Sequence, residues 1–106
     1  MNIYRILCLG SFLVLAQLAL AKLPFSNDAF GKVEGTLDFC TQADAQNAPK
    51  YQEGKQALVR DVPENEVKEA RDSKEYKDAY SEISDQLAKV PKEQAVKSCR
   101  DYLEGK

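Results

Sequence analysis

The chain has 106 residues, with 15 Lys and Arg side chains, 17 Asp and Glu side chains, no His and no Trp. This length supports one compact domain at most. The lack of His excludes Ser-His-Asp catalysis, Cys-His catalysis and His-based zinc sites, because all three need an imidazole. The net charge of −2 also argues against a general nucleic-acid-binding protein, which needs a concentrated basic face.

Residues 1–21 have the pattern of a secretory signal peptide. Arg5 precedes an uncharged run from Ile6 to Ala21, which ends in the small-x-small sequence Ala19-Leu20-Ala21 that signal peptidase accepts. As a helix this run would span about 24 Å, less than the hydrocarbon core of a bilayer, which is about 30 Å thick. We therefore expect a signal peptide (1–21) and a single helical domain (22–106), secreted or periplasmic, with no stable membrane insertion after cleavage. An uncleaved membrane anchor is the alternative.

Two cysteines, Cys40 and Cys99, follow the expected cleavage site. An even pair in an oxidising compartment typically forms a structural disulfide. Closing a loop of about 60 residues would stabilise the fold by about 4 kcal/mol in the chain-entropy model. Such a contribution would help a chain whose small apolar core must offset the ordering entropy of every residue. A redox-active pair is the alternative, although the chain has no Cys-x-x-Cys motif.

Apolar residues recur at helical spacing after the signal peptide, with no alternating strand pattern and no hairpin turn. The spacing predicts an all-α bundle of four to five short helices tied by the disulfide. The first predicted helix is capped by Ser26 or Asn27 and carries Phe30, Val33, Leu37 and Cys40 on one face. A second helix is predicted over about 49–60, and a short third helix after Pro63. The fourth is predicted over about 73–89, and the fifth begins at Pro91.

Several positions refine these helices. Gly31 and Gly35 weaken the first helix by up to about 1 kcal/mol each and would allow a close neighbour. The segment from Thr41 to Ala48 is small and polar, which predicts a loop. Asp72 and Glu75 have capping-box spacing, which predicts Asp72 as the N-cap of the fourth helix.

Three apolar residues near the first helix are candidate interaction anchors. Phe39 lies on the face opposite the apolar stripe of that helix, so either another helix covers it or it is an exposed anchor. Phe25 and Leu23 precede the helix, and they could cover Phe39 or extend the same patch. The candidate anchors are therefore Phe39, Phe25 and Leu23.

Other groups of residues have more ordinary interpretations. Four tyrosines fall on predicted inward faces: Tyr51, Tyr76, Tyr80 and Tyr102. They could line a pocket for a small aromatic or lipid-like ligand, but a tyrosine at a helix contact with its hydroxyl in water is more common. The acidic residues over 64–75 lack the spacing of an EF-hand loop. We expect no catalytic residue, no metal site and no cofactor.

These observations favour a non-enzymatic binding module of the periplasm or extracellular space. The partner is not identified; a protein partner and a monomeric state are expected. An acid-type envelope-stress chaperone is the alternative, because at low pH the 17 carboxylates neutralise and repulsion between the remaining cations could loosen a thin core. A small enzyme is a third possibility. In architecture alone the chain resembles small periplasmic stress chaperones and small helical immunity or inhibitor proteins.

Overall fold

The computed structural model describes residues 23–105, and this range is all-helical. The elements in chain order are α2 (Asn27–Ala43), the 3₁₀ turn η1 (Ala45–Asn47), α3 (Ala48–Leu58), α4 (Glu64–Asp72), α5 (Lys74–Ala88) and α6 (Lys92–Leu103). The predicted all-α class is confirmed, whereas the predicted signal peptide, 1–21, lies outside the described residues. Over 23–105 no helix has both the length and the apolar character that a membrane crossing needs.

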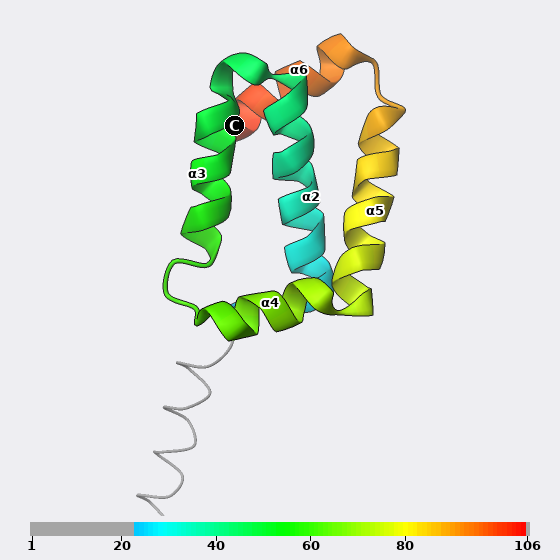
Figure 1. Cartoon of the computed structure of the whole chain (residues 1–106). Coiled ribbons are helices and arrows are strands. Elements are labelled where there is room, and N and C mark those ends of the chain that lie inside the picture. The colour runs from blue at the N-terminus through cyan, green and yellow to red at the C-terminus, as the bar shows by residue number, and fades with distance from the viewer. Residues whose placement is uncertain (1–22, 106) are drawn as a thin grey trace, which may run out of the picture.

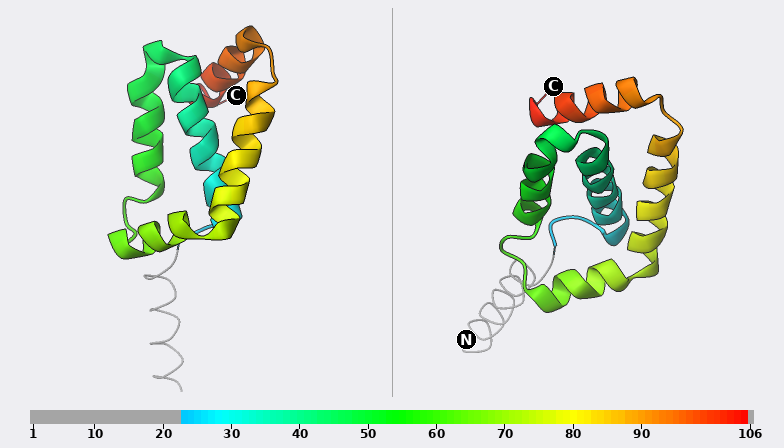
Figure 2. Two further views of the ribbon diagram at one scale, coloured as in Figure 1. Left: turned by 45° about the vertical axis from the view of Figure 1, so that its right-hand side comes forward. Right: turned by 45° about the horizontal axis from the view of Figure 1, so that its top comes forward.

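Helix α2 is the central element of the fold. Figure 1 shows α3 and α5 flanking it, with α4 crossing at the end where α2 begins and α6 crossing at the end where α2 finishes. The two further views in Figure 2 show the same arrangement. Contacts from α2 reach α3, α4, α5 and α6, so each of the other α-helices packs on this one.

The helix boundaries follow from local hydrogen bonds. Ser26 caps α2, because its Oγ accepts from the backbone N–H of Ala29 at 3.4 Å. The predicted loop over 41–48 is wrong at both ends: α2 continues to Ala43, η1 follows, and α3 already begins at Ala48. The hydroxyl of Thr41 donates to the carbonyl of Leu37 at 2.8 Å, so this polar residue is held within the helix.

The predicted N-cap of α5 is off by one residue. Ser73 is the cap, with extended backbone angles and an Oγ that accepts from the Tyr76 N–H at 3.2 Å. Asp72 is the last residue of α4 and still helical, so it pairs instead with Lys68 at 2.7 Å.

The buried side chains form two clusters at opposite ends of α2. The cluster at the α4 end consists of Phe30, Val67, Ala70 and Tyr76. The cluster at the α6 end consists of Leu37, Cys40, Tyr51 and Cys99. The predicted disulfide is confirmed in the second cluster, where Cys40 and Cys99 join α2 to α6 with Cα atoms 5.7 Å apart.

The close neighbour of the two glycines of α2 is α5. A Cβ atom added to Gly31 would stand 2.3 Å from the backbone carbonyl oxygen of Tyr76. One added to Gly35 would stand 2.6 Å from the Cγ2 atom of Ile83 and 3.2 Å from the carbonyl oxygen of Tyr80. Helices α2 and α5 therefore approach each other more closely than any larger residue at these positions would allow.

Candidate functional site

Three carboxylates on or next to α2 each accept a hydrogen bond from a tyrosine hydroxyl. The pairs are Tyr76 to Glu34 at 2.6 Å, Tyr80 to Asp38 at 2.5 Å, and Tyr51 to Asp44 at 2.8 Å. Each carboxylate also has a basic partner. We call the three carboxylates, the three tyrosines and these basic side chains the carboxylate network. Within 23–105, no fully buried side-chain nitrogen or oxygen lacks a partner.

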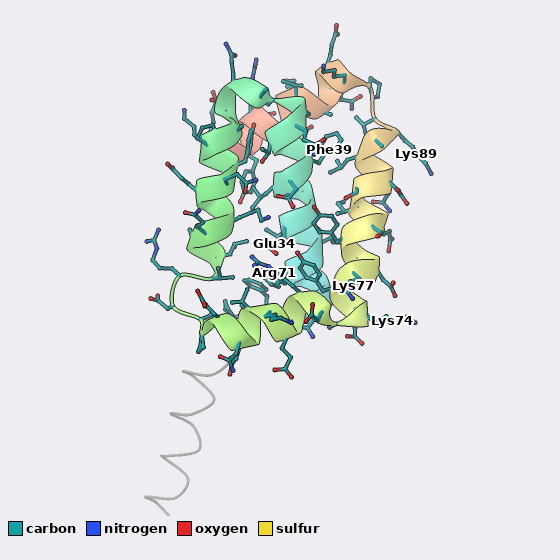
Figure 3. The ribbon with its side chains drawn as sticks, viewed as in Figure 1. Glu34, Phe39, Arg71, Lys74, Lys77 and Lys89 are labelled. Carbon is teal, nitrogen blue, oxygen red and sulfur yellow. A yellow bond between two sulfur atoms is a disulfide. The ribbon has the colours of Figure 1, made fainter. Side chains whose placement is uncertain are left out.

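Glu34 is the most deeply placed charge of the network, with no exposed surface. The guanidinium of Arg71 binds it with two bonds, Nε to Oε1 at 2.8 Å and Nη2 to Oε2 at 2.7 Å. Figure 3 shows the two side chains facing each other between α2 and α4. Arg71 also lies over the Phe30 ring, 5.5 Å from its centroid. This bidentate pair supplies the compensation that a buried carboxylate requires.

Asp38 connects the two helices that flank α2. From α3 it accepts bonds from Lys55 at 2.8 Å and Gln52 at 3.2 Å, while Tyr80 donates from α5. Burial acts to raise the pKa of Asp38, but the bonds from Lys55, Tyr80 and Gln52 together outweigh it and leave the pKa below its usual value. The burial of Tyr80 and its hydrogen bond to Asp38 raise the pKa of the Tyr80 hydroxyl to about 12.

Asp44 follows the last residue of α2 and is almost fully buried. Its carboxylate accepts from Asn47 and Tyr51 at 2.8 Å each and from Arg100 of α6 at 3.4 Å. The bond from Asn47 is the main cause of a lowered Asp44 pKa, to which Tyr51 and Arg100 add. Burial, with the bond to Asp44, raises the pKa of Tyr51 to about 12.

The sequence analysis placed the tyrosines but not their hydrogen-bond partners. Tyr51, Tyr76 and Tyr80 do face inward, and their hydroxyls donate to carboxylates. Tyr102 was placed wrongly, because it is 53 % exposed. One signal could have found the network: Glu34 follows Phe30 by four residues, so a carboxylate lies beside the apolar stripe of the first helix.

A groove lies between the segment before α2 and α4. Its volume is about 700 Å³ and its lining consists of Leu23, Phe25, Asn27, Glu66, Glu69, Ala70, Asp72 and Ser73. We call it the α4 groove. Phe25 is fixed in its floor by Phe30, whose ring centroid is 5.3 Å away.

The structure separates the three candidate anchors. Leu23 and Phe25 meet in the α4 groove, where both also pack on the cluster around Phe30. Phe39 lies toward the α6 end of α2 and is half-buried against the other cluster (Figure 3). Leu23 and Phe25 therefore do not cover Phe39, and the three residues do not form one patch.

Within residues 23–105, no group of three or more His, Cys, Asp and Glu side chains is placed to hold a metal ion. The α4 groove and the carboxylate network remain as candidate functional features among these residues. Comparison of the chain with protein-family models, curated proteins and solved structures finds no match.

Proposed function

We propose that this protein is an exported, non-enzymatic binding module whose α4 groove holds an extended segment of a partner protein. The observation that carries the proposal is the composition of the groove. Its floor is apolar, and three carboxylates belong to its lining, Glu66, Glu69 and Asp72, with no basic side chain among the described lining residues. A segment with apolar side chains flanked by Lys or Arg complements this surface.

The groove has the size and rigidity for such a role. A volume of about 700 Å³ lies within the range of binding pockets, about 300–1,000 Å³. The ring contact between Phe25 and Phe30 holds the floor in place before binding, which lowers the ordering cost of association. Asp72 is paired with Lys68 at the rim, so Glu66 and Glu69 are the carboxylates that would contribute most to a cationic partner.

Binding of three designed peptides tests this proposal: one alternating Lys and Leu, one alternating Glu and Leu, and one alternating Lys and Ser. We expect saturable binding of the Lys-Leu peptide alone at low salt, because only it matches both the charge and the apolar floor. The variant Glu66→Gln/Glu69→Gln is expected to bind it about tenfold more weakly, which corresponds to about 1.4 kcal/mol. Fluorescence anisotropy of the labelled peptides measures all three affinities.

The matched control is Asp78→Asn/Asp85→Asn, which removes the same charge from exposed positions of α5. It should bind the Lys-Leu peptide like the unchanged protein. Equal affinity for the Lys-Leu and Glu-Leu peptides, or equal weakening by the two double variants, would contradict a site in the α4 groove.

A second candidate function, an acid-responsive chaperone, is favoured by the carboxylate network. Through Glu34, Asp38 and the C-cap Asp44, α2 and the residue after it are bonded to α3, α4, α5 and α6. Protonation of Asp38 and Asp44 would remove their ionic bonds to Lys55 and Arg100, while these basic side chains keep their charge. The small clusters at either end would then face net repulsion, and apolar surface for client proteins could become exposed.

The acid response has a definite sign. Asp38 and Asp44 have lower pKa values in the folded protein than in the unfolded chain. Their contribution to the free energy of unfolding is therefore fully present above the unfolded pKa, about 4, and is lost as the pH falls through the folded pKa. We expect the free energy of unfolding to fall steeply below about pH 4. Asp38→Asn should be less stable at pH 7 and should lose less stability on acidification. Urea unfolding followed by circular dichroism between pH 7 and pH 2 measures both effects.

Asp85→Asn is the control for this experiment, because that residue is exposed on α5 and should leave the acid response unchanged. Binding of a hydrophobic dye should rise over the same pH range, together with suppression of client aggregation. A protein that stays folded and binds no dye down to about pH 2 has no acid switch, and the chaperone function would then be rejected.

A further inference from the structure

A second, smaller pocket lies on a different part of the molecule from the α4 groove. Its volume is about 290 Å³, and it is lined by Lys32, Val33, Thr36, Leu37, Ile83 and Tyr102. Three helices build it: α2 supplies four of these residues, α5 supplies Ile83 and α6 supplies Tyr102. We call it the Tyr102 pocket.

The walls of this pocket are apolar, with one cation at the edge. Val33, Leu37 and Ile83 supply aliphatic surface. Tyr102 is the large apolar side chain that is most exposed over 23–105, at 53 %. The hydroxyl of Thr36 is already donated to the Lys32 carbonyl at 2.8 Å. The ammonium of Lys32, an exposed residue, is therefore the charged group that a ligand would meet among the described lining residues.

The pocket is also held open by fixed parts of the fold. Gly35 lets Ile83 approach α2, since a Cβ there would stand 2.6 Å from its Cγ2 atom. The disulfide holds α6, and therefore Tyr102, against the end of α2. An aliphatic chain would enter a surface that already exists, so little ordering would oppose binding.

We propose that the Tyr102 pocket binds a medium-chain fatty acid, with the aliphatic chain between Leu37, Ile83 and Tyr102 and the carboxylate at the Lys32 ammonium. The apolar lining favours an aliphatic chain, and the single cation favours a monoanionic head group over a neutral or cationic one. The small volume limits the chain length. This site is independent of the peptide site proposed for the α4 groove.

Titration with decanoate, below its micelle concentration and followed by ¹H–¹⁵N NMR, tests the proposal. We expect saturable binding of one decanoate, with the largest shift changes in the middle of α2 and in α6. Octanoate should bind more weakly, by about fourfold for each methylene removed from the apolar surface. Decanol and decylammonium should each bind at least fivefold more weakly than decanoate, because they lose the ion pair with Lys32.

The variants separate the pocket from a general apolar surface. Lys32→Glu should weaken decanoate binding at least fivefold, whereas Lys77→Glu, an equal charge change at an exposed position of α5, should not. Tyr102→Ser should weaken binding about tenfold, and Tyr102→Phe should preserve it because the apolar wall remains. Since Lys32 and Tyr102 are exposed, neither change should unfold the protein.

Any of the following results would overturn the proposal: no saturable binding of decanoate, affinity that does not depend on chain length or head-group charge, or equal effects of Lys32→Glu and Lys77→Glu. Shift changes confined to the α4 groove would overturn it as well. Glu66→Gln/Glu69→Gln should leave decanoate affinity unchanged, so failure of the peptide site and failure of the fatty-acid site would be distinguishable.

Discussion

Replacing Gly31 by alanine is expected to lower the free energy of unfolding by about 3 kcal/mol, although alanine is the better helix former by about 1 kcal/mol. The added Cβ would stand 2.3 Å from the carbonyl oxygen of Tyr76, which is backbone and cannot turn aside. Helices α2 and α5 would have to separate. That movement would also pull the Tyr76 hydroxyl away from Glu34, which lies one turn further along α2.

Gly54→Ala is the matched control for this substitution. Gly54 also lies inside a helix, but a Cβ there would meet only the side chain of Leu37, at 3.8 Å, an ordinary contact. It should therefore gain up to about 1 kcal/mol of stability. Urea unfolding followed by circular dichroism measures both variants. If Gly31→Ala is as stable as the unchanged protein, the close approach of α2 and α5 is not a feature of the molecule in solution.

Removing the disulfide by Cys40→Ala/Cys99→Ala is expected to lower the free energy of unfolding by about 4 kcal/mol. The two cysteines are 59 positions apart, so the bond restricts a long loop of the unfolded chain. In the folded protein it also anchors α6, whose buried side chains are few, Ala95 and Cys99. Urea unfolding gives the overall loss, and amide hydrogen exchange shows where it falls.

Exchange should accelerate most in α6, because this helix is no longer tethered to α2 and can open locally. The α2–α5 contact at the other end of the molecule should keep more of its protection. Reduction of the unchanged protein provides an independent check, since it should reproduce both results without a substitution. A uniform acceleration of exchange along the whole chain would contradict a local role for the disulfide.

The secondary structure was predictable because its signals are local. Phe30, Val33, Leu37 and Cys40 mark one face of α2, and Pro63 and Pro91 stand immediately before α4 and α6. The cysteine pairing was predictable as well, because Cys40 and Cys99 were the only two cysteines left after the expected cleavage site. The helices could be inferred from residues that are close in the sequence, and the disulfide from the number of cysteines.

The candidate sites were less predictable because they depend on how distant helices meet. Glu34 bonds to Tyr76, 42 positions away, so no local sequence pattern around Glu34 identifies its partner. The α4 groove exists only because α4 crosses the segment that holds Leu23 and Phe25. Phe39 had been grouped with them by its position in the sequence, and the length of α2 separates them in space.

The connection between α3 and α4 divides the chain into two parts that stay joined in other ways. Arg60 and Asp61 are exposed there, while Val59 and Val62 on either side pack on the cluster around Phe30. One part contains α2 and α3, and the other contains α4, α5 and α6. The disulfide links the two parts covalently, and the packing of α5 on α2 holds them together at the opposite end. Backbone continuity at Arg60 is therefore not needed to hold the two parts of the folded protein together: a single cut at this residue by a trypsin-like protease would leave a two-chain molecule that comes apart only after both reduction and unfolding.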